Sequence, residues 1–115
     1  MHEYSIVQAL LAQVERQAAR HGASAVRRLE VRIGELSGVE VDLLKTAYEM
    51  MRDRTICDGA PMEVTPVVAR WECRACGQAI PQGMALRCAA CGSGARLTAG
   101  DEIMLDRIEL EVADV

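Results

Sequence analysis

Two cysteine motifs decide the architecture of this chain: Cys73-Arg74-Ala75-Cys76-Gly77 and Cys88-Ala89-Ala90-Cys91-Gly92. In each motif one tight turn can present two sulfurs to the same ion, and the final glycine lets the backbone turn back beneath them. Four thiolates in a tetrahedral arrangement suit zinc, with an iron–sulfur centre or redox dithiols as the alternatives. The sequence therefore predicts a zinc site on Cys73, Cys76, Cys88 and Cys91.

The predicted zinc site is structural, because a metal with four cysteine ligands has no open position at which to activate water. The segment around it is too small to bury a sufficient core, so metal binding would supply its folding energy. Zinc ribbons also bind nucleic acid, but only Trp71 is available here for base stacking. The sequence therefore gives little support to nucleic-acid binding.

The composition indicates one folded, cytoplasmic protein of 115 residues. Half of the residues are hydrophobic, and the formal net charge of −4 argues against a general nucleic-acid or anionic-membrane binder. No stretch approaches the roughly 20 apolar residues of a membrane span, and Glu3 stands where a secretory signal would carry basic residues. The five cysteines, four of them clustered, favour a metal site in a reducing compartment. Cys57 stands alone and is expected to be a small buried thiol.

Apolar periodicity predicts a helix and then a strand in the first third of the chain. From Glu3 to about Arg20, an amphipathic helix is indicated by the stripe Ile6, Val7, Leu10, Leu11, Val14 and Ala18. This stripe would pack in the core, or offer an exposed edge at Ile6, Leu10 and Val14 to a partner. Residues 26–34 alternate between apolar and charged side chains, the period of a half-buried strand.

The rest of the chain predicts a second helix and two more strands. A helix should start near Glu40, with Ser37 and Glu40 spaced as a capping box, and its apolar face would be Leu43, Leu44, Ala47, Tyr48 and Met51. Residues 62–71 form a strand that Pro66 confines to a sheet edge or a bulge. Residues 103–112 form a strand whose apolar phase slips near Asp106-Arg107, which implies a bulge or two packing environments.

His2 has a notable position at the start of the chain. An imidazole there can join deprotonated main-chain nitrogens in a planar, nitrogen-rich set, which favours Ni(II) or Cu(II) over zinc. The alternative is an ordinary terminal histidine without a ligand role.

The order of these features resembles the HypA/HybF family of nickel-insertion accessory proteins in NiFe-hydrogenase maturation. The resemblance covers the whole chain and depends on the Met1-His2-Glu3 start, Ile33-Gly34-Glu35-Leu36-Ser37 and the inserted cysteine pairs. It implies an α/β (α+β) fold, with two helices on a small three-stranded sheet and an inserted zinc-ribbon-like module. The domains would be residues 1–70 with 103–115 for nickel, and residues 71–102 for zinc.

The same resemblance implies a nickel metallochaperone that is not an enzyme. Ni(II) as cargo would be held by His2 and Glu3, with Glu40 as the least secure further ligand, and Zn(II) would be structural on the four cysteines. The implied partners are a HypB-type GTPase, the NiFe-hydrogenase large subunit and, in some cases, urease maturation proteins; a weak homodimer is allowed. The alternative function is a zinc-ribbon module that binds protein or nucleic acid and carries no nickel.

Overall fold

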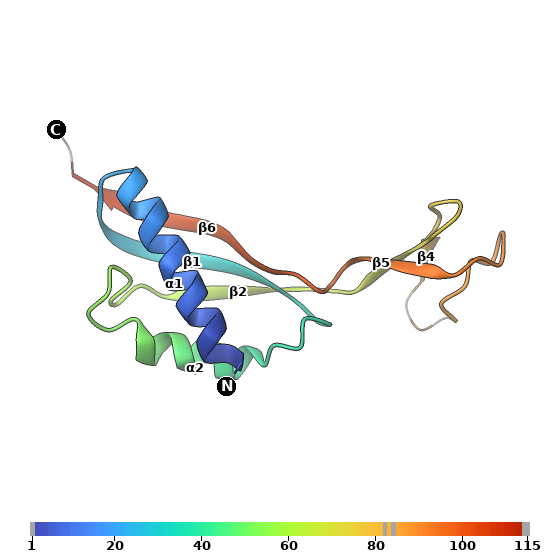
Figure 1. Ribbon diagram of the computed structural model, residues 1–115, viewed down its shortest axis with the longest axis horizontal. Helices are drawn as coiled ribbons and strands as arrows, with labels where there is room; N and C mark the ends of the chain where they lie inside the picture. The colour runs from blue at the N-terminus through green and yellow to red at the C-terminus, as the bar shows by residue number, and fades with distance from the viewer. Residues whose placement is uncertain (1, 82, 84, 114–115) are drawn as a thin grey trace.

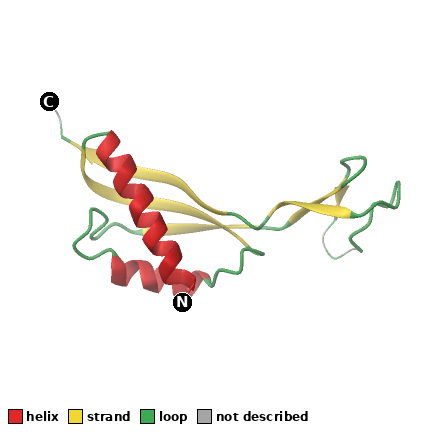
Figure 2. Cartoon of the chain, viewed as in Figure 1, coloured by secondary structure: helices red, strands yellow, loops and turns green. Residues whose placement is uncertain are grey.

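The computed structural model describes residues 2–81, 83 and 85–113. Over these residues it contains two helices and two small sheets (Figures 1 and 2). In chain order the elements are α1 (His2–Arg20), β1 (Ala23–Gly34), α2 (Val41–Met51), β2 (Met62–Val67), β3 (Arg70–Cys73), β4 (Ala79–Ile80), β5 (Ala95–Ala99) and β6 (Ile103–Val112).

The larger sheet has the strand order β2-β1-β6, with β1 parallel to β2 and antiparallel to β6. Pro66 therefore lies on an edge strand, as its missing N–H requires. The predicted irregularity of the last strand is also confirmed: Glu30 pairs with Arg107 and Val31 with Leu105, which leaves Asp106 without a partner on β1. This bulge lets Leu105 and Ile108 both pack against the core.

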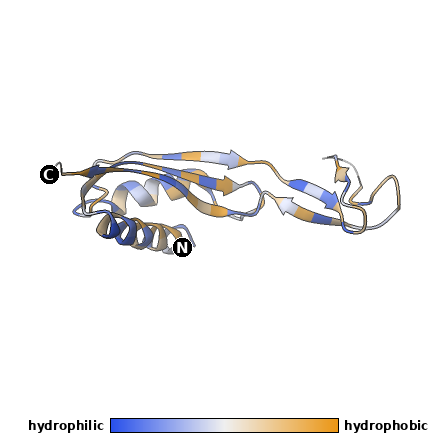
Figure 3. Ribbon diagram, turned by 90° about the horizontal axis from the view of Figure 1, so that it is seen from above, coloured by the Kyte–Doolittle hydropathy of each residue, from blue (hydrophilic) through white to orange (hydrophobic). Residues whose placement is uncertain are grey.

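Both helices lie on the same side of this sheet (Figure 3), and the core fills the space between them. The apolar stripe of α1 supplies five buried residues, among them Leu10 and Val14. Because these two side chains are buried, the stripe does not offer the exposed docking edge considered from the sequence. Cys57 is fully buried in the same core, as expected for a lone small thiol.

The second helix starts near Glu40, as predicted, but its N-terminus is not capped in the predicted way. The helix begins at Val41, so Glu40 occupies the N-cap position and makes no side-chain capping bond. Ser37 lies three residues before that position, and its hydroxyl accepts the N–H of Val39 at 3.3 Å. The capping box is therefore absent. Leu43, predicted on the buried face, is 53% exposed instead.

The second sheet, β4-β3-β5, projects from the first (Figure 1). The molecule consequently measures 59 × 33 × 16 Å, with a radius of gyration of 18.2 Å, against about 13 Å for a compact 100-residue domain. The small sheet has its own core, and the buried members of that core among the described residues are Cys73, Ile80 and Cys88. So small a core needs a further source of stability.

Two chain crossings join the small sheet to the large one, from β2 to β3 and from β5 to β6. Backbone hydrogen bonds hold both crossings against the end of β1. Gly34 N–H donates to Glu102 O at 2.8 Å and Leu36 N–H to Gly100 O at 2.7 Å on the β5–β6 side, and Glu35 N–H donates to Val67 O at 2.9 Å on the β2–β3 side. The contact is close enough to need glycine, because a Cβ on Gly34 would lie 2.0 Å from the Gly100 carbonyl oxygen. Backbone hydrogen bonds therefore hold the junction between the two sheets, and the backbones there are too close together for a side chain at position 34.

Candidate metal centre

Four cysteine sulfurs converge at the end of the projecting sheet, each of them a free thiol. The Sγ atoms of Cys73 and Cys91 are 3.3 Å apart, those of Cys76 and Cys88 are 3.7 Å apart, and all four lie within 4.8 Å of one another. These separations exceed the roughly 2.05 Å of a disulfide. They are close to the roughly 3.8 Å edge of a tetrahedron of sulfurs about 2.3 Å from zinc. The cluster therefore fits a metal ion that is bound by four thiolates.

The two cysteine motifs build the site with the same backbone hydrogen bonds. Cys73 N–H donates to Gln78 O and Gly77 N–H donates to Cys73 O; fifteen residues later, Cys88 and Gly92 repeat this pattern. Gly77 and Gly92 have φ values of 75° and 74°, a conformation that favours glycine. Each glycine thus closes the turn that points two sulfurs inward.

Backbone donors favour the thiolate at Cys73. The N–H groups of Cys76 and Ala75 both point at its sulfur at 3.4 Å and lower the pKa of Cys73 to about 6. At Cys76 an N–H of Gln78 lowers the pKa, but the sulfurs of Cys73 and Cys88 raise it more, to about 11. Without a cation, one thiolate therefore opposes the ionisation of the next, so a divalent metal is needed to hold all four ionised.

The N-terminal candidates come together where the two helices begin. His2 is exposed in the first turn of α1, and the Glu3 carboxylate accepts the N–H of Glu40 at 3.2 Å. This hydrogen bond, with a second from the N–H of Glu3 itself and the charge of nearby His2, lowers the pKa of the Glu3 carboxyl. Glu3 therefore ties the start of α1 to the start of α2, a link that the sequence did not reveal.

His2, Glu3 and Glu40 do not form a side-chain metal cluster. Among the described residues, the four cysteines are the only group of three or more histidine, cysteine or acidic side chains with ligand atoms close enough to share an ion. Any ion at His2 would therefore depend on main-chain nitrogens. The first four N–H groups of a helix lack intrahelical partners, so those of His2 and Glu3 are not committed to the α1 ladder. Met1, quoted with them in the sequence motif, lies outside the described residues.

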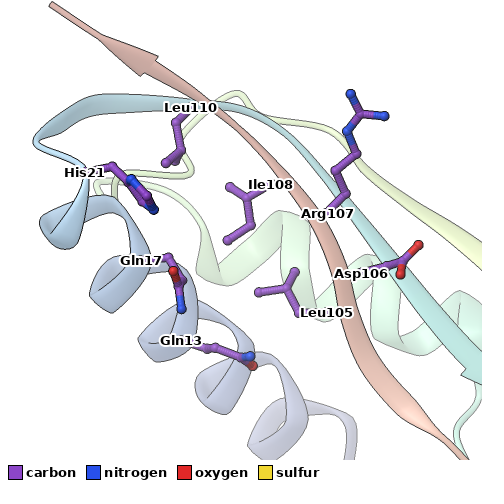
Figure 4. A pocket seen from close by; sticks show the side chains of 8 residues that line it. All are labelled: Gln13, Gln17, His21, Leu105, Asp106, Arg107, Ile108 and Leu110. Atoms are coloured by element: carbon purple, nitrogen blue, oxygen red, sulfur yellow. The ribbon is translucent and has the colours of Figure 1, made fainter.

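A hollow of about 280 Å³ separates α1 from β6 (Figure 4) but contains none of the predicted ligands. Gln13, Gln17 and His21 line its helix side, opposite Leu105, Ile108 and Leu110. Within the described part of the chain, His21 belongs to no group of three or more histidine, cysteine or acidic side chains whose ligand atoms could share an ion. The hollow therefore gives no ligand set that would make it a candidate metal centre.

Comparison with known proteins gives this geometry a family. The profile of a family described as "Hydrogenase/urease nickel incorporation, metallochaperone, hypA" matches residues 1–110. The chain belongs to the HypA family. It is 41% identical to the hydrogenase maturation factor HypA of Nitrosospira multiformis, with 96% of this chain and 97% of the relative covered. It is 43% identical to that of Shewanella halifaxensis, with 98% and 100% covered.

Solved HypA structures share the fold. The solution structure of the Ni metallochaperone HypA from Helicobacter pylori matches with a TM-score of 0.76 at 29% identity, covering 96% of this chain and 98% of that one. A second HypA solution structure matches with a TM-score of 0.82 at 29% identity, covering 98% of both chains. The predicted fold class is confirmed, and the HypA family is one of metallochaperones rather than enzymes. No helix in the described residues has both the length and the apolar character to cross a membrane.

Proposed function

We propose that this chain binds one Ni(II) ion at its N-terminal segment and delivers it to the large subunit of a NiFe hydrogenase. The observation that carries the proposal is the position of His2: its imidazole is exposed in the first helical turn of a HypA-family chain. Main-chain nitrogens beside it, with the imidazole, make a planar set that favours a low-spin d⁸ ion. Glu3 contributes its main-chain nitrogen, because its carboxylate is engaged by Glu40 N–H.

Glu40 has a secondary part in this proposal. Its carboxylate makes no capping bond, and its N–H is bonded to the Glu3 carboxylate, so the Glu40 backbone lies next to Glu3. The Glu40 carboxylate would complete the nickel shell or add negative charge next to the cation. Either role makes Glu40→Gln weaken nickel binding less than a change at His2.

The second metal in the proposal is a structural Zn(II) on Cys73, Cys76, Cys88 and Cys91. The sulfur separations and the closed, four-thiolate shell support zinc held for stability rather than for chemistry. Residues 71–102 then form a zinc-binding domain inserted into a nickel-binding domain of residues 1–70 and 103–115. The separate sheets and separate cores support this division.

The partners and location follow from the same proposal. A HypB-type GTPase and the hydrogenase large subunit are the expected partners, with urease maturation proteins in some settings. Nucleic acid is not expected, since the module places a single tryptophan, Trp71, beside its core. The cytoplasm is the proposed location, because a four-thiolate site needs reduced cysteines.

Calorimetric titration of the untagged, zinc-replete protein with Ni(II) tests the function. The wild type should bind one equivalent, and His2→Ala should abolish this binding while zinc content and melting stay unchanged. His21→Ala, which changes the other histidine of the chain, is the matched control and should bind nickel normally. Nickel binding retained by His2→Ala would refute the assignment, as would sulfur ligands in the X-ray absorption spectrum of the nickel-loaded protein. A zinc-loaded wild type that takes no nickel would leave the zinc-ribbon interaction module as the function.

A further inference from the structure

Two side-chain contacts fix the start of the chain to the rest of the fold. The Glu3 carboxylate accepts the N–H of Glu40 at 3.2 Å. This bond joins the first turn of α1 to the residue just before α2, near the start of the chain (Figure 1). Tyr4 packs against the core, and its hydroxyl donates to Met50 Sδ at 3.5 Å. Two successive residues of α1 thus hold its first turn against α2.

The first turn is the part of α1 that most needs such contacts. Helix ends open easily, because their backbone groups lack intrahelical partners. The fully buried residues of α1 begin only at Val7, so core packing secures the helix after its first turn. His2 is exposed and Glu3 is half-buried. Loss of the bond between Glu3 and Glu40 would therefore loosen the first turn without unfolding the rest of α1.

We propose that the Glu3 carboxylate is a positioning group for nickel and not one of its ligands. Resting on the proposed function, this carboxylate holds the main-chain nitrogens of His2 and Glu3 in the helical first turn by binding Glu40 N–H. The peptide units of a helix align along its axis with their N–H groups toward the N-terminus, so the two nitrogens face the same side. A loosened first turn presents them together for only part of the time, and the apparent nickel affinity falls by that fraction.

Two other roles of the Glu3 carboxylate would have different consequences. As a nickel ligand, it would act independently of Glu40 N–H and would contribute to the absorption spectrum of the bound ion. As a negative charge beside the cation, it would be no more important than other nearby acids. Asp42 is such an acid, exposed in the first turn of α2 and two residues after Glu40.

The test measures Ni(II) affinity by calorimetry on the untagged, zinc-replete full chain. Glu3→Ala should bind nickel about fivefold more weakly, as loss of one hydrogen bond predicts. Glu3→Gln should lose less, because its amide oxygen still accepts an N–H. At saturating nickel the absorption spectrum of Glu3→Ala should match the wild type, because the ligands are the same. Asp42→Ala is the matched control for charge and should bind nickel within about twofold of the wild type.

Two variants at position 40 isolate the hydrogen bond. Both Glu40→Ala and Glu40→Pro remove the carboxylate, but only proline also removes the N–H. Glu40 has a φ of −82°, close to the φ of proline, so the ring fits the backbone φ there. With Glu3 intact, Glu40→Pro should bind nickel about fivefold more weakly than Glu40→Ala. In a chain that already carries Glu3→Ala, the two variants at position 40 should bind equally.

Three results would overturn the positioning role. The first is a changed nickel spectrum in Glu3→Ala, and the second is equal affinity of Glu40→Ala and Glu40→Pro with Glu3 intact. The third is an equal loss in Glu3→Ala and Glu3→Gln, which decides the question even if Glu40→Pro does not fold. Failure of the proposed function is read from another variant, because nickel binding retained by His2→Ala would refute the N-terminal site whatever the Glu3 variants do.

Discussion

Replacing Gly34 by alanine should be severely destabilising, because a backbone contact closes the junction between the two sheets. The added Cβ would lie 2.0 Å from the Gly100 oxygen, and ordinary contact begins at 3.4 Å. The backbone segments around Gly34 and Gly100 must therefore separate by about 1.4 Å. That movement breaks the bonds from Leu36 N–H to Gly100 O and from Gly34 N–H to Glu102 O, each worth about 1 kcal/mol. Local overpacking adds about 1–3 kcal/mol. The expected loss in the free energy of unfolding is therefore about 3–5 kcal/mol.

Urea unfolding of the zinc-replete protein, followed by the helical circular dichroism signal, measures this loss. Gly59→Ala is the control, because Gly59 has φ +77° but nothing within 4 Å of its added Cβ. There the strain of a left-handed residue alone should cost about 1–2 kcal/mol. If Gly34→Ala loses no more stability than Gly59→Ala, the crowded junction is not what joins the sheets. Zinc content should be unchanged in both variants, because the cysteine motifs close on their own hydrogen bonds.

Three further predictions test the separate cores and their thiols. Cys88→Ala should release zinc and unfold the projecting sheet while the helical signal persists, and full zinc content by elemental analysis would contradict this. Leu44→Ala, at a fully buried position, should cost about 2–5 kcal/mol in denaturant and leave zinc bound; zinc loss would mean that the cores are coupled. In chelator-treated native protein at mildly alkaline pH, four thiols should react with a disulfide reagent and Cys57 should not. Burial raises the pKa of the Cys57 thiol and shields it, so a fifth fast thiol would refute its placement.

The sequence alone determined the features that depend on local spacing. The cysteine motifs with their glycines, the stripe of α1, the edge position of Pro66 and the bulge at Asp106 could all be predicted. In each case the physical constraint acts between residues close in the chain, such as a turn that presents two sulfurs or the alternation of a strand. Such features can therefore be predicted from the spacing of residues along the chain, without knowledge of the fold.

The tertiary structure alone decided which apolar residues remain exposed and which distant residues meet. Leu43 has the helical spacing of a core residue, but the packing of α2 in the fold leaves it 53% exposed. The expected cap at Ser37 gave way to a bond between Glu3 and Glu40, thirty-seven residues apart, because the two helix starts converge. The contact of Gly34 with Gly100 likewise joins residues that are far apart in the sequence, because the segment before β6 packs against the end of β1. Such contacts depend on the relative placement of whole elements, which periodicity along one segment does not encode.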